Sequence, residues 1–303
     1  MKKPVQELVI ISGKGGTGKT SIAASLAALA GPAVLADCDV DAADLHLILS
    51  PDVKRREEFR SGHWAAIRQS ACTGCGDCAA LCRFDAVRRV ERDNGTAAYV
   101  INPTACEGCG VCVRFCPEQA IDFLERSCGE WFVSETRYGP MVHAKLGIAA
   151  ENSGKLVSLV RTQAREIAKR REFDLVLVDG APGIGCPVIA SITGADLVLI
   201  ITEPTLSGAH DLERVLLLTR HFQVPALVCV NKWDLNPSMT EQIEHAAEAH
   251  EAVVAGRVRY DTDVTAAQIR AQAAVECECD AADDIRALWR KVAAVGESHG
   301  IRL

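Results

Sequence analysis

Cysteines are the most abundant reactive side chains in this sequence, and eight of the 14 follow two copies of one spacing. Each copy reads C-x2-C-x2-C-x3-C, and corresponding cysteines of the two copies lie 34 residues apart. Thiolates at this spacing are typical ligands of 4Fe–4S clusters, and the fourth cysteine of each run binds the other cluster. One ligand set is then Cys72, Cys75, Cys78 and Cys116, and the other is Cys106, Cys109, Cys112 and Cys82.

Zinc and disulfides are the other common uses of paired cysteines. Zinc ribbons also contain C-x2-C, but two triplets with matched fourth cysteines depart from zinc spacing. Disulfides need an oxidising compartment, and we expect no secretion by a signal peptide, because the start at Met1 leads straight into a strand pattern. We therefore expect two 4Fe–4S clusters. The second run ends in Cys116-Pro117, as in bacterial ferredoxins, whereas Arg83 takes the place of the proline in the first.

A second motif with chemical meaning is the glycine-rich stretch 13–20, which fits G-x-x-x-x-G-K-[ST]. It follows an apolar run and opens an alanine-rich helix, as a phosphate-binding loop requires. Backbone N–H groups and the helix N-terminus would face the phosphates. Lys19 would reach the β- and γ-phosphates, and Thr20 would ligate Mg²⁺. The expected nucleotide contacts are Gly13, Gly15, Gly16, Thr17, Gly18, Lys19, Thr20 and Ser21.

Short apolar runs alternate with helical patterns on both sides of the cysteines. Such runs are typical of parallel strands that are buried on both faces. We expect strands at 8–11, 33–36, 175–178, 197–201 and 226–230, and helices at 153–171, 187–193, 207–221 and 239–250. The predicted fold is an α/β P-loop domain with a mostly parallel sheet and helices on both faces. Its two parts, 1–66 and 126–303, flank a small α+β ferredoxin-like insert at 67–125, in whose core we expect Phe84, Phe115 and Phe123.

The composition is that of an ordinary globular protein. Of the 303 residues, 49% are hydrophobic and 24% are charged. The net charge of −7 lacks the basic footprint of a nucleic-acid binder, so we expect no nucleic-acid partner. Because no apolar run approaches the length of a membrane span, we expect a cytoplasmic protein without stable membrane insertion. The final stretch, 285–303, is also expected to lack a strong apolar stripe.

The loop sequence K-G-G-T-G-K-T resembles the deviant Walker A motif of the MinD/ParA superfamily, which includes the nitrogenase iron protein. The resemblance implies that ATP binding forms a sandwich homodimer in which Lys14 reaches the phosphates of the partner subunit. It also implies that Lys14 and Lys19 are catalytic.

Three further motifs are similar to those of the same superfamily. Asp37-Cys38-Asp39 ends the second apolar run, and the resemblance assigns Asp39 to the attacking water and Asp37 to the magnesium shell. Asp179 follows the run at 175–178 and would lie near magnesium. Asn231 is similar to the asparagine that contacts the base. Because Asn231-Lys232-Trp233-Asp234 also fits the guanine-reading N-K-x-D motif, the choice of ATP over GTP rests on the family resemblance.

Nearly the whole chain is similar to MinD-superfamily ATPases that carry an inserted two-cluster ferredoxin. The resemblance implies an ATPase that hydrolyses Mg-ATP and couples its nucleotide state to electron transfer to or from an unidentified redox protein. The alternative is an ATPase that assembles or carries a metallocluster, with a labile cluster passing through Cys186 or Cys128 to an accepting protein. A third class is a positioning switch in which the clusters are structural.

Overall fold

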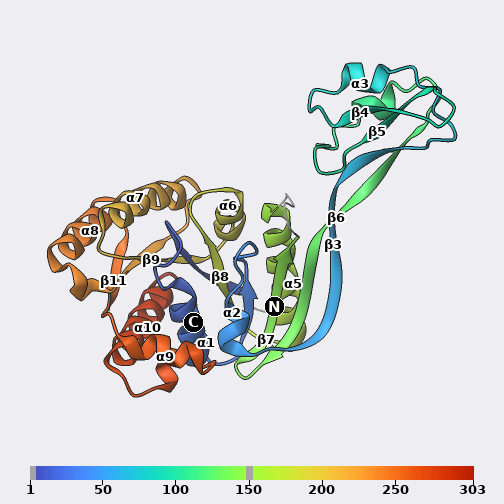
Figure 1. Ribbon diagram of the computed structural model, residues 1–303. Helices are drawn as coiled ribbons and strands as arrows, with labels where there is room; N and C mark the ends of the chain where they lie inside the picture. The colour runs from blue at the N-terminus through green and yellow to red at the C-terminus, as the bar shows by residue number, and fades with distance from the viewer. Residues whose placement is uncertain (1–4, 148–152) are drawn as a thin grey trace. The chain divides into compact units, whose positions relative to one another are not determined.

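The computed structural model describes residues 5–147 and 153–303, which form two compact units (Figure 1). The sheet unit comprises the chain up to Glu57, Glu130–Leu146 and Ser153–Leu303. The cysteine unit comprises Glu58–Gly129 and the segment that starts at Gly147. The divisions at Glu57 and Gly129 fall within two long strands, β3 (Asp52–Ile67) and β6 (Ile121–Thr136).

The sheet unit is built on parallel strands. Their order is β11 (Val253–Val258), β10 (Ala226–Asn231), β9 (Leu197–Thr202), β1 (Gln6–Ser12), β8 (Leu175–Pro182), β2 (Ala33–Asp37) and β7 (Gly139–Leu146). All neighbouring strands among these seven pair in parallel, and β6 and β3 follow β7 in the sheet. The central strands are buried along almost their whole length, which explains why they read as continuous apolar runs.

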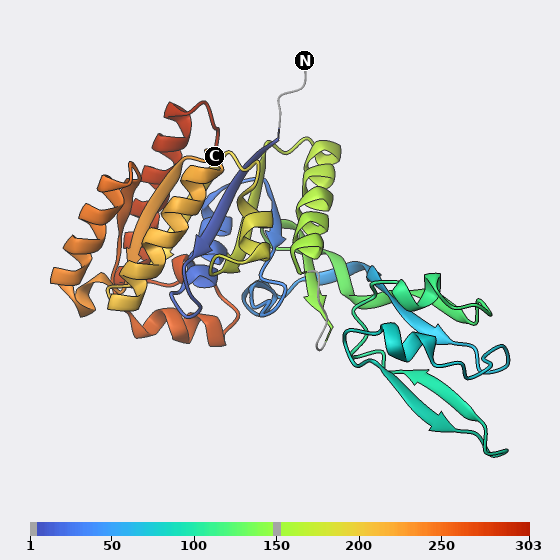
Figure 2. The same cartoon turned by 90° about the horizontal axis from the view of Figure 1, so that it is seen from above.

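Helices cover both faces of this sheet (Figures 1 and 2). On one face lie α1 (Lys19–Leu29), α2 (Leu45–Leu49) and α10 (Asp280–Ser298). On the other lie α5 (Ser153–Arg171), α6 (Cys186–Ile192), α7 (Leu206–His221) and α8 (Pro237–Ala249). The shorter α9 (Thr262–Ile269) follows β11, and 3-10 turns span Trp233–Leu235 and Ala274–Glu276. The strands and helices expected at these places are confirmed, with ends that differ by a few residues.

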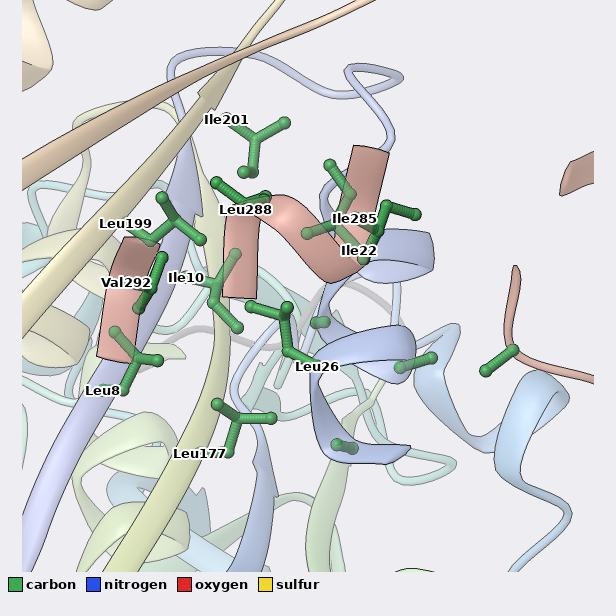
Figure 3. Close-up of a cluster of buried hydrophobic side chains, with 14 of the residues drawn as sticks. Leu8, Ile10, Ile22, Leu26, Leu177, Leu199, Ile201, Ile285, Leu288 and Val292 are labelled. Atoms are coloured by element: carbon green, nitrogen blue, oxygen red, sulfur yellow. The ribbon is translucent and has the colours of Figure 1, made fainter. Parts of the chain in front are cut away.

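The core under α1 and α10 shows how alternation along a strand divides the side chains (Figure 3). Leu8 and Ile10 of β1 point to this face, where they meet Ile22 and Leu26 of α1. Contrary to the expectation for 285–303, α10 has a clear apolar stripe, which includes Leu288. That stripe is buried against the sheet, so it contributes to the core. None of the helices within the described residues is both long enough and apolar enough to cross a membrane.

One charged group lies inside the sheet unit. Glu7 of β1 is fully buried, and its carboxylate binds the guanidinium groups of Arg161 and Arg165 on α5. Both carboxylate oxygens of Glu7 accept hydrogen bonds from these arginines, as a buried charge requires. This ion pair ties the first strand to a helix more than 150 positions later in the chain.

The cysteine unit is small and consists mostly of loops and short elements that carry the eight cysteines of the repeat. It contains the antiparallel pair β4 (Val87–Glu91) and β5 (Ala97–Ile101), together with the short helices α3 (Asp77–Leu81) and α4 (Val111–Arg114). Its small buried core centres on Ala65, Ala86, Cys106 and Ile121. The prediction that the three phenylalanines lie in this core is wrong, because Phe84, Phe115 and Phe123 are 44%, 59% and 40% exposed.

Candidate functional site

The phosphate loop joins β1 to α1 and carries glycines where backbone conformation and space demand them. Gly16 and Gly18 have φ angles of 80° and 89°, a left-handed conformation that glycine adopts without strain. A Cβ atom at Gly18 would lie 2.3 Å from Nδ2 of Asn231. The loop therefore keeps its backbone close to neighbouring elements and leaves N–H groups at the start of α1 free for an anion.

A cavity of about 700 Å³ opens beside this loop. Asp39 and Asn231 line it, with side chains from β11 and α9 on the far wall. The loop residues that line it are Gly15, Gly16, Thr17, Gly18, Lys19, Thr20 and Ser21. Gly13 does not line the cavity but packs against α7, where an added Cβ would lie 2.5 Å from Cβ of Asp211.

Lys19 lies among three carboxylates, of which Asp37 ends β2, Asp39 follows it and Asp179 belongs to the second half of β8. Its Nζ atom is 2.6 Å from Oδ1 of Asp179 and 3.4 Å from Oδ2 of Asp39. Asp37 stands opposite Asp179 in the register of β2 and β8, because carboxyl ends of parallel strands meet at one edge. Burial works against the charged form of Lys19, but Asp179 and Asp39 outweigh it and raise the pKa of Lys19. Lys19 therefore remains a cation.

Asp37 is fully buried, yet only one of its carboxyl oxygens has a hydrogen-bond partner. Oδ1 accepts from the N–H of Asp39 at 3.2 Å, whereas Oδ2 has no partner among the described residues. Oδ2 of Asp179 is also buried and unpartnered in that part of the chain. Burial, together with the negative charge of Asp179, raises the pKa of Asp37 well above its ordinary value. Burial likewise raises the pKa of Asp39. Carboxylate oxygens in such a position suit Mg²⁺, which prefers hard oxygen ligands.

The second lysine of the loop, Lys14, is held by residues that follow β9. Its Nζ atom lies 2.6 Å from Oε1 of Glu203 and 2.8 Å from Oγ of Ser207. The other carboxylate oxygen of Glu203 is 3.2 Å from Nζ of Lys232, which also donates to the carbonyl oxygen of Gly16. Burial of Glu203 opposes its charge, but hydrogen bonds from Lys14 and Lys232 lower its pKa. Glu203 thus links both lysines at the edge of the phosphate loop.

Asn231 is hydrogen-bonded to the backbone of the phosphate loop. Its Nδ2 atom donates to the carbonyl oxygen of Thr17 at 2.7 Å, and its side chain also lines the cavity. Asp234, the last residue of the N-K-x-D sequence, accepts a hydrogen bond from the N–H of Tyr260. Asp234 is not among the described residues that line the cavity.

The cysteine unit has two cavities, and each is lined by four cysteines. The first cavity is lined by Cys72, Cys75, Cys78 and Cys116. The second cavity is lined by Cys82, Cys106, Cys109 and Cys112. These are the two crossed sets that the spacing predicts, and all 14 cysteines of the chain are free thiols.

Glycines allow the cysteine loops to approach neighbouring backbone. An added Cβ at Gly74 would lie 2.3 Å from the carbonyl oxygen of Ala97, and one at Gly108 would lie 2.2 Å from that of His63. Burial raises the pKa of the Cys78 thiol to about 11, so a metal bound there must displace a proton. In residues 5–147 and 153–303, no group of three or more His, Cys, Asp or Glu side chains is arranged to hold a single metal ion.

Residues 8–274 match the CobQ/CobB/MinD/ParA nucleotide-binding domain. The chain belongs to this family. It is a P-loop ATPase of the MinD/ParA type, and the phosphate loop, Lys19 and the three carboxylates all lie within the matched residues.

Relatives of this MinD/ParA-type ATPase occur among sequences and solved structures. The uncharacterized protein MJ0578 of Methanocaldococcus jannaschii is 36% identical over 236 residues, which cover 77% of this chain and 80% of the relative. The cell division ATPase MinD of Pyrococcus furiosus is 17% identical with a TM-score of 0.56, over 96% of this chain and 99% of that one. MinD of Pyrococcus horikoshii, solved with Mg-ADP, is 15% identical with a TM-score of 0.56, over 97% and 98%. These structural matches show the shared fold.

Three residues at the candidate site have no role assigned from the sequence. Glu203 sits at the carboxyl end of β9, and Lys232 is the lysine of the N-K-x-D sequence. The signal for Glu203 was its place directly after an apolar strand, since ligand sites of open α/β sheets collect at strand ends. Gln268 of α9, whose side chain donates to Oγ of Ser21 at 2.6 Å, had no comparable signal.

Proposed function

We propose that this ATPase binds two 4Fe–4S clusters and couples its nucleotide state to electron transfer through them. The observation that carries the proposal is the pair of cavities, each lined by one of the two crossed sets of four cysteines. Because the phosphate loop and the cysteines belong to one chain, nucleotide binding and electron transfer would take place in the same molecule.

The residues around Lys19 fit Mg-ATP. The unpartnered buried oxygens of Asp37 and Asp179 and the hydroxyl of Thr20 would hold the metal or its water ligands. When bound, the magnesium ion would supply positive charge beside the phosphates. Lys19 would stabilise the charge that develops on the transferred phosphoryl group, and Asp39 would orient the attacking water.

Lys14 has the position expected of a lysine that acts on a partner subunit. It lies at the edge of the loop and is 28% exposed at its side chain, whereas the Lys19 side chain is 6% exposed. The family resemblance supports an ATP-dependent homodimer in which Lys14 leaves Glu203 and contacts the phosphates of the second copy. Release from Glu203 would then be part of dimer formation.

The donor sets fit iron–sulfur clusters better than zinc. A structural zinc site requires four ligands at about 2.0–2.3 Å from one ion, and two cysteine triplets with matched fourth cysteines depart from the usual zinc spacing. Four thiols around a cavity fit a cubane, which spreads its ligands over four iron atoms. Each cluster would provide a one-electron redox centre, and the cysteines would hold it as thiolates.

The test is an anaerobic redox titration followed by EPR, with and without Mg-ATP. We expect about eight iron atoms per chain, four for each cluster. A coupling of about 1–3 kcal/mol between nucleotide and clusters would shift a midpoint potential by about 45–130 mV. Lys19→Ala should abolish that shift, because the shift depends on bound nucleotide.

Cysteine variants provide matched controls. Cys75 and Cys186 are both exposed, but only Cys75 lines a cavity. Cys75→Ser should lower the iron content or change the spectrum of one cluster, whereas Cys186→Ser should do neither. A chain that holds no iron after anaerobic reconstitution would refute the clusters. The carrier function predicts a different result: the wild type would transfer a cluster to an apo-ferredoxin, and Cys186→Ser would not. In that function Cys186 takes part because it is exposed, whereas Cys128 is buried.

A further inference from the structure

The 34-residue repeat extends beyond the cysteines to the hydrogen bonds that fix each loop. Nη2 of Arg92 donates to the carbonyl oxygen of Cys72 at 2.7 Å. Arg126, 34 positions later, donates in the same way to the carbonyl oxygen of Cys106. The two cavities therefore have the same arginine in the same place. Any electrostatic difference between them must come from other positions.

The side chains that line the two cavities break this symmetry. Asp77 lines the first cavity, whereas Val111, its counterpart 34 residues later, lines the second. Glu118 lines the first cavity, and its counterpart Phe84 lines the second. Glu107, which stands where the first half has a threonine, is the single carboxylate side chain among the described residues that line the second cavity. The first cavity has two.

The residue after each fourth cysteine increases the difference. Arg83 directly follows Cys82, which lines the second cavity. In the first cavity the corresponding neighbour of Cys116 is the uncharged Pro117. The wall of the first cavity thus has two carboxylates, whereas the second cavity has one carboxylate in its wall and an arginine next to one of its lining cysteines.

Charged residues just outside the cavity walls do not reverse this difference. In the first half, Asp122 is paired with Arg68 through a salt bridge. In the second half, the oppositely charged Asp85 and Arg88 flank the lining residues Ala86 and Val87. The contrast between the cavities is therefore about two negative charges, all on exposed side chains.

Reduction adds a negative charge to a cluster, and nearby carboxylates oppose that change. Building on the proposed function, we propose that the cluster in the second cavity takes the first electron and the cluster in the first cavity takes the second. The electron comes from a one-electron reductant, such as reduced methyl viologen, and no bond or proton moves. Each exposed charge should change the one-electron equilibrium about threefold, so two charges separate the clusters about tenfold, or about 59 mV.

The experiment is an EPR-monitored redox titration of the anaerobically reconstituted full-length chain and two variants. Asp77→Asn combined with Glu118→Gln removes the charges of the first cavity, and Glu107→Gln is the matched variant of the second. The double variant should raise the lower midpoint potential by about 59 mV, which is a tenfold change in the one-electron equilibrium constant. It should leave the upper midpoint potential unchanged. Glu107→Gln should raise only the upper potential, about threefold. Since the side chains are exposed, high salt should reduce the separation of the two steps in the wild type.

Three results would overturn the inference while leaving the clusters in place. They are a single unresolved step in wild-type protein that holds about eight iron atoms, a shift of the upper step in the double variant, and a shift of the lower step in Glu107→Gln. A chain that takes up no iron would instead refute the proposed function, and the iron and sulfide content of each sample separates that case from the others.

Discussion

The binding of Mg-nucleotide should release a proton from Asp37. Burial and the nearby Asp179 raise the pKa of Asp37, and one of its oxygens lacks a hydrogen-bond partner among the described residues. We therefore expect the nucleotide-free protein to keep Asp37 protonated at pH values where a free aspartate has lost its proton. If Mg²⁺ binds at this carboxylate, the proton must leave. The release should approach one proton per site, and the affinity for Mg-ADP should then rise up to tenfold per pH unit, or about 1.4 kcal/mol.

The assay is calorimetric titration with Mg-ADP in buffers of different ionisation enthalpy, since the variation of the apparent enthalpy gives the number of protons released. Asp37→Asn is the matched variant, because it keeps the shape of the side chain and cannot release a proton. ADP with a chelator in place of Mg²⁺ is the second control. Proton release of zero in the wild type, or equal release in Asp37→Asn, would refute the reasoning.

The same raised pKa sets the sign of a stability effect. The folded protein holds the Asp37 proton at pH values where the unfolded chain, with a pKa near 3.9, has lost it. Protons are therefore bound more tightly in the folded state, and the free energy of unfolding of the nucleotide-free protein should fall as pH rises from about 4 toward the folded-state pKa. Asp37→Asn should remove that part of the pH dependence, which urea unfolding at a series of pH values would measure.

Three further variants test other parts of the sheet unit. Gly18→Ala should weaken nucleotide binding at least about tenfold in titration calorimetry, because the added Cβ would clash with Asn231. Gly31→Ala is the control: Gly31 also has a positive φ but lies in open space, so the affinity should not change. Glu7→Gln should lower the free energy of unfolding in urea by about 3 kcal/mol, since it leaves buried guanidinium charge uncompensated, whereas Glu135→Gln at an exposed pair should change it by less than about 1 kcal/mol. Glu203→Gln should lower the ATP concentration needed for dimerisation about fivefold in analytical ultracentrifugation, because it frees the loop lysine; an unchanged or higher requirement would contradict that role.

The central sheet could be predicted because its strands are buried on both faces. Runs such as Leu197–Ile201 contain only apolar residues, so their type and place are unambiguous in the sequence. The long strand β3 could not be predicted in the same way. Its first half, from Asp52, is rich in charged residues and mostly exposed, so neither an apolar run nor a regular alternation marks it.

The contacts at the candidate site were also predictable only in part. Lys19 and Asp179 are part of local motifs at strand ends, and the parallel topology brings them together. The bond between Lys14 and Glu203 depends on β9 lying next to β1, a neighbourhood that the chain order does not reveal. In the cysteine unit, spacing alone predicted which thiols share a cavity. The exposure of Phe115 was not predictable, because the small unit has too little core to bury large side chains.

If the chain binds the two proposed clusters, the exchange of one cysteine between the two halves of the repeat determines how they can be inserted. Bringing Cys116 to the first cavity closes a long loop of chain, at an entropic cost that must be met before a cluster is held by all four thiols. The first cluster to be inserted would fix both halves together and leave the second cavity with its ligands already in place. Iron loading is therefore expected to be cooperative, with few half-filled molecules. Oxidative damage to one cluster should likewise destabilise the other.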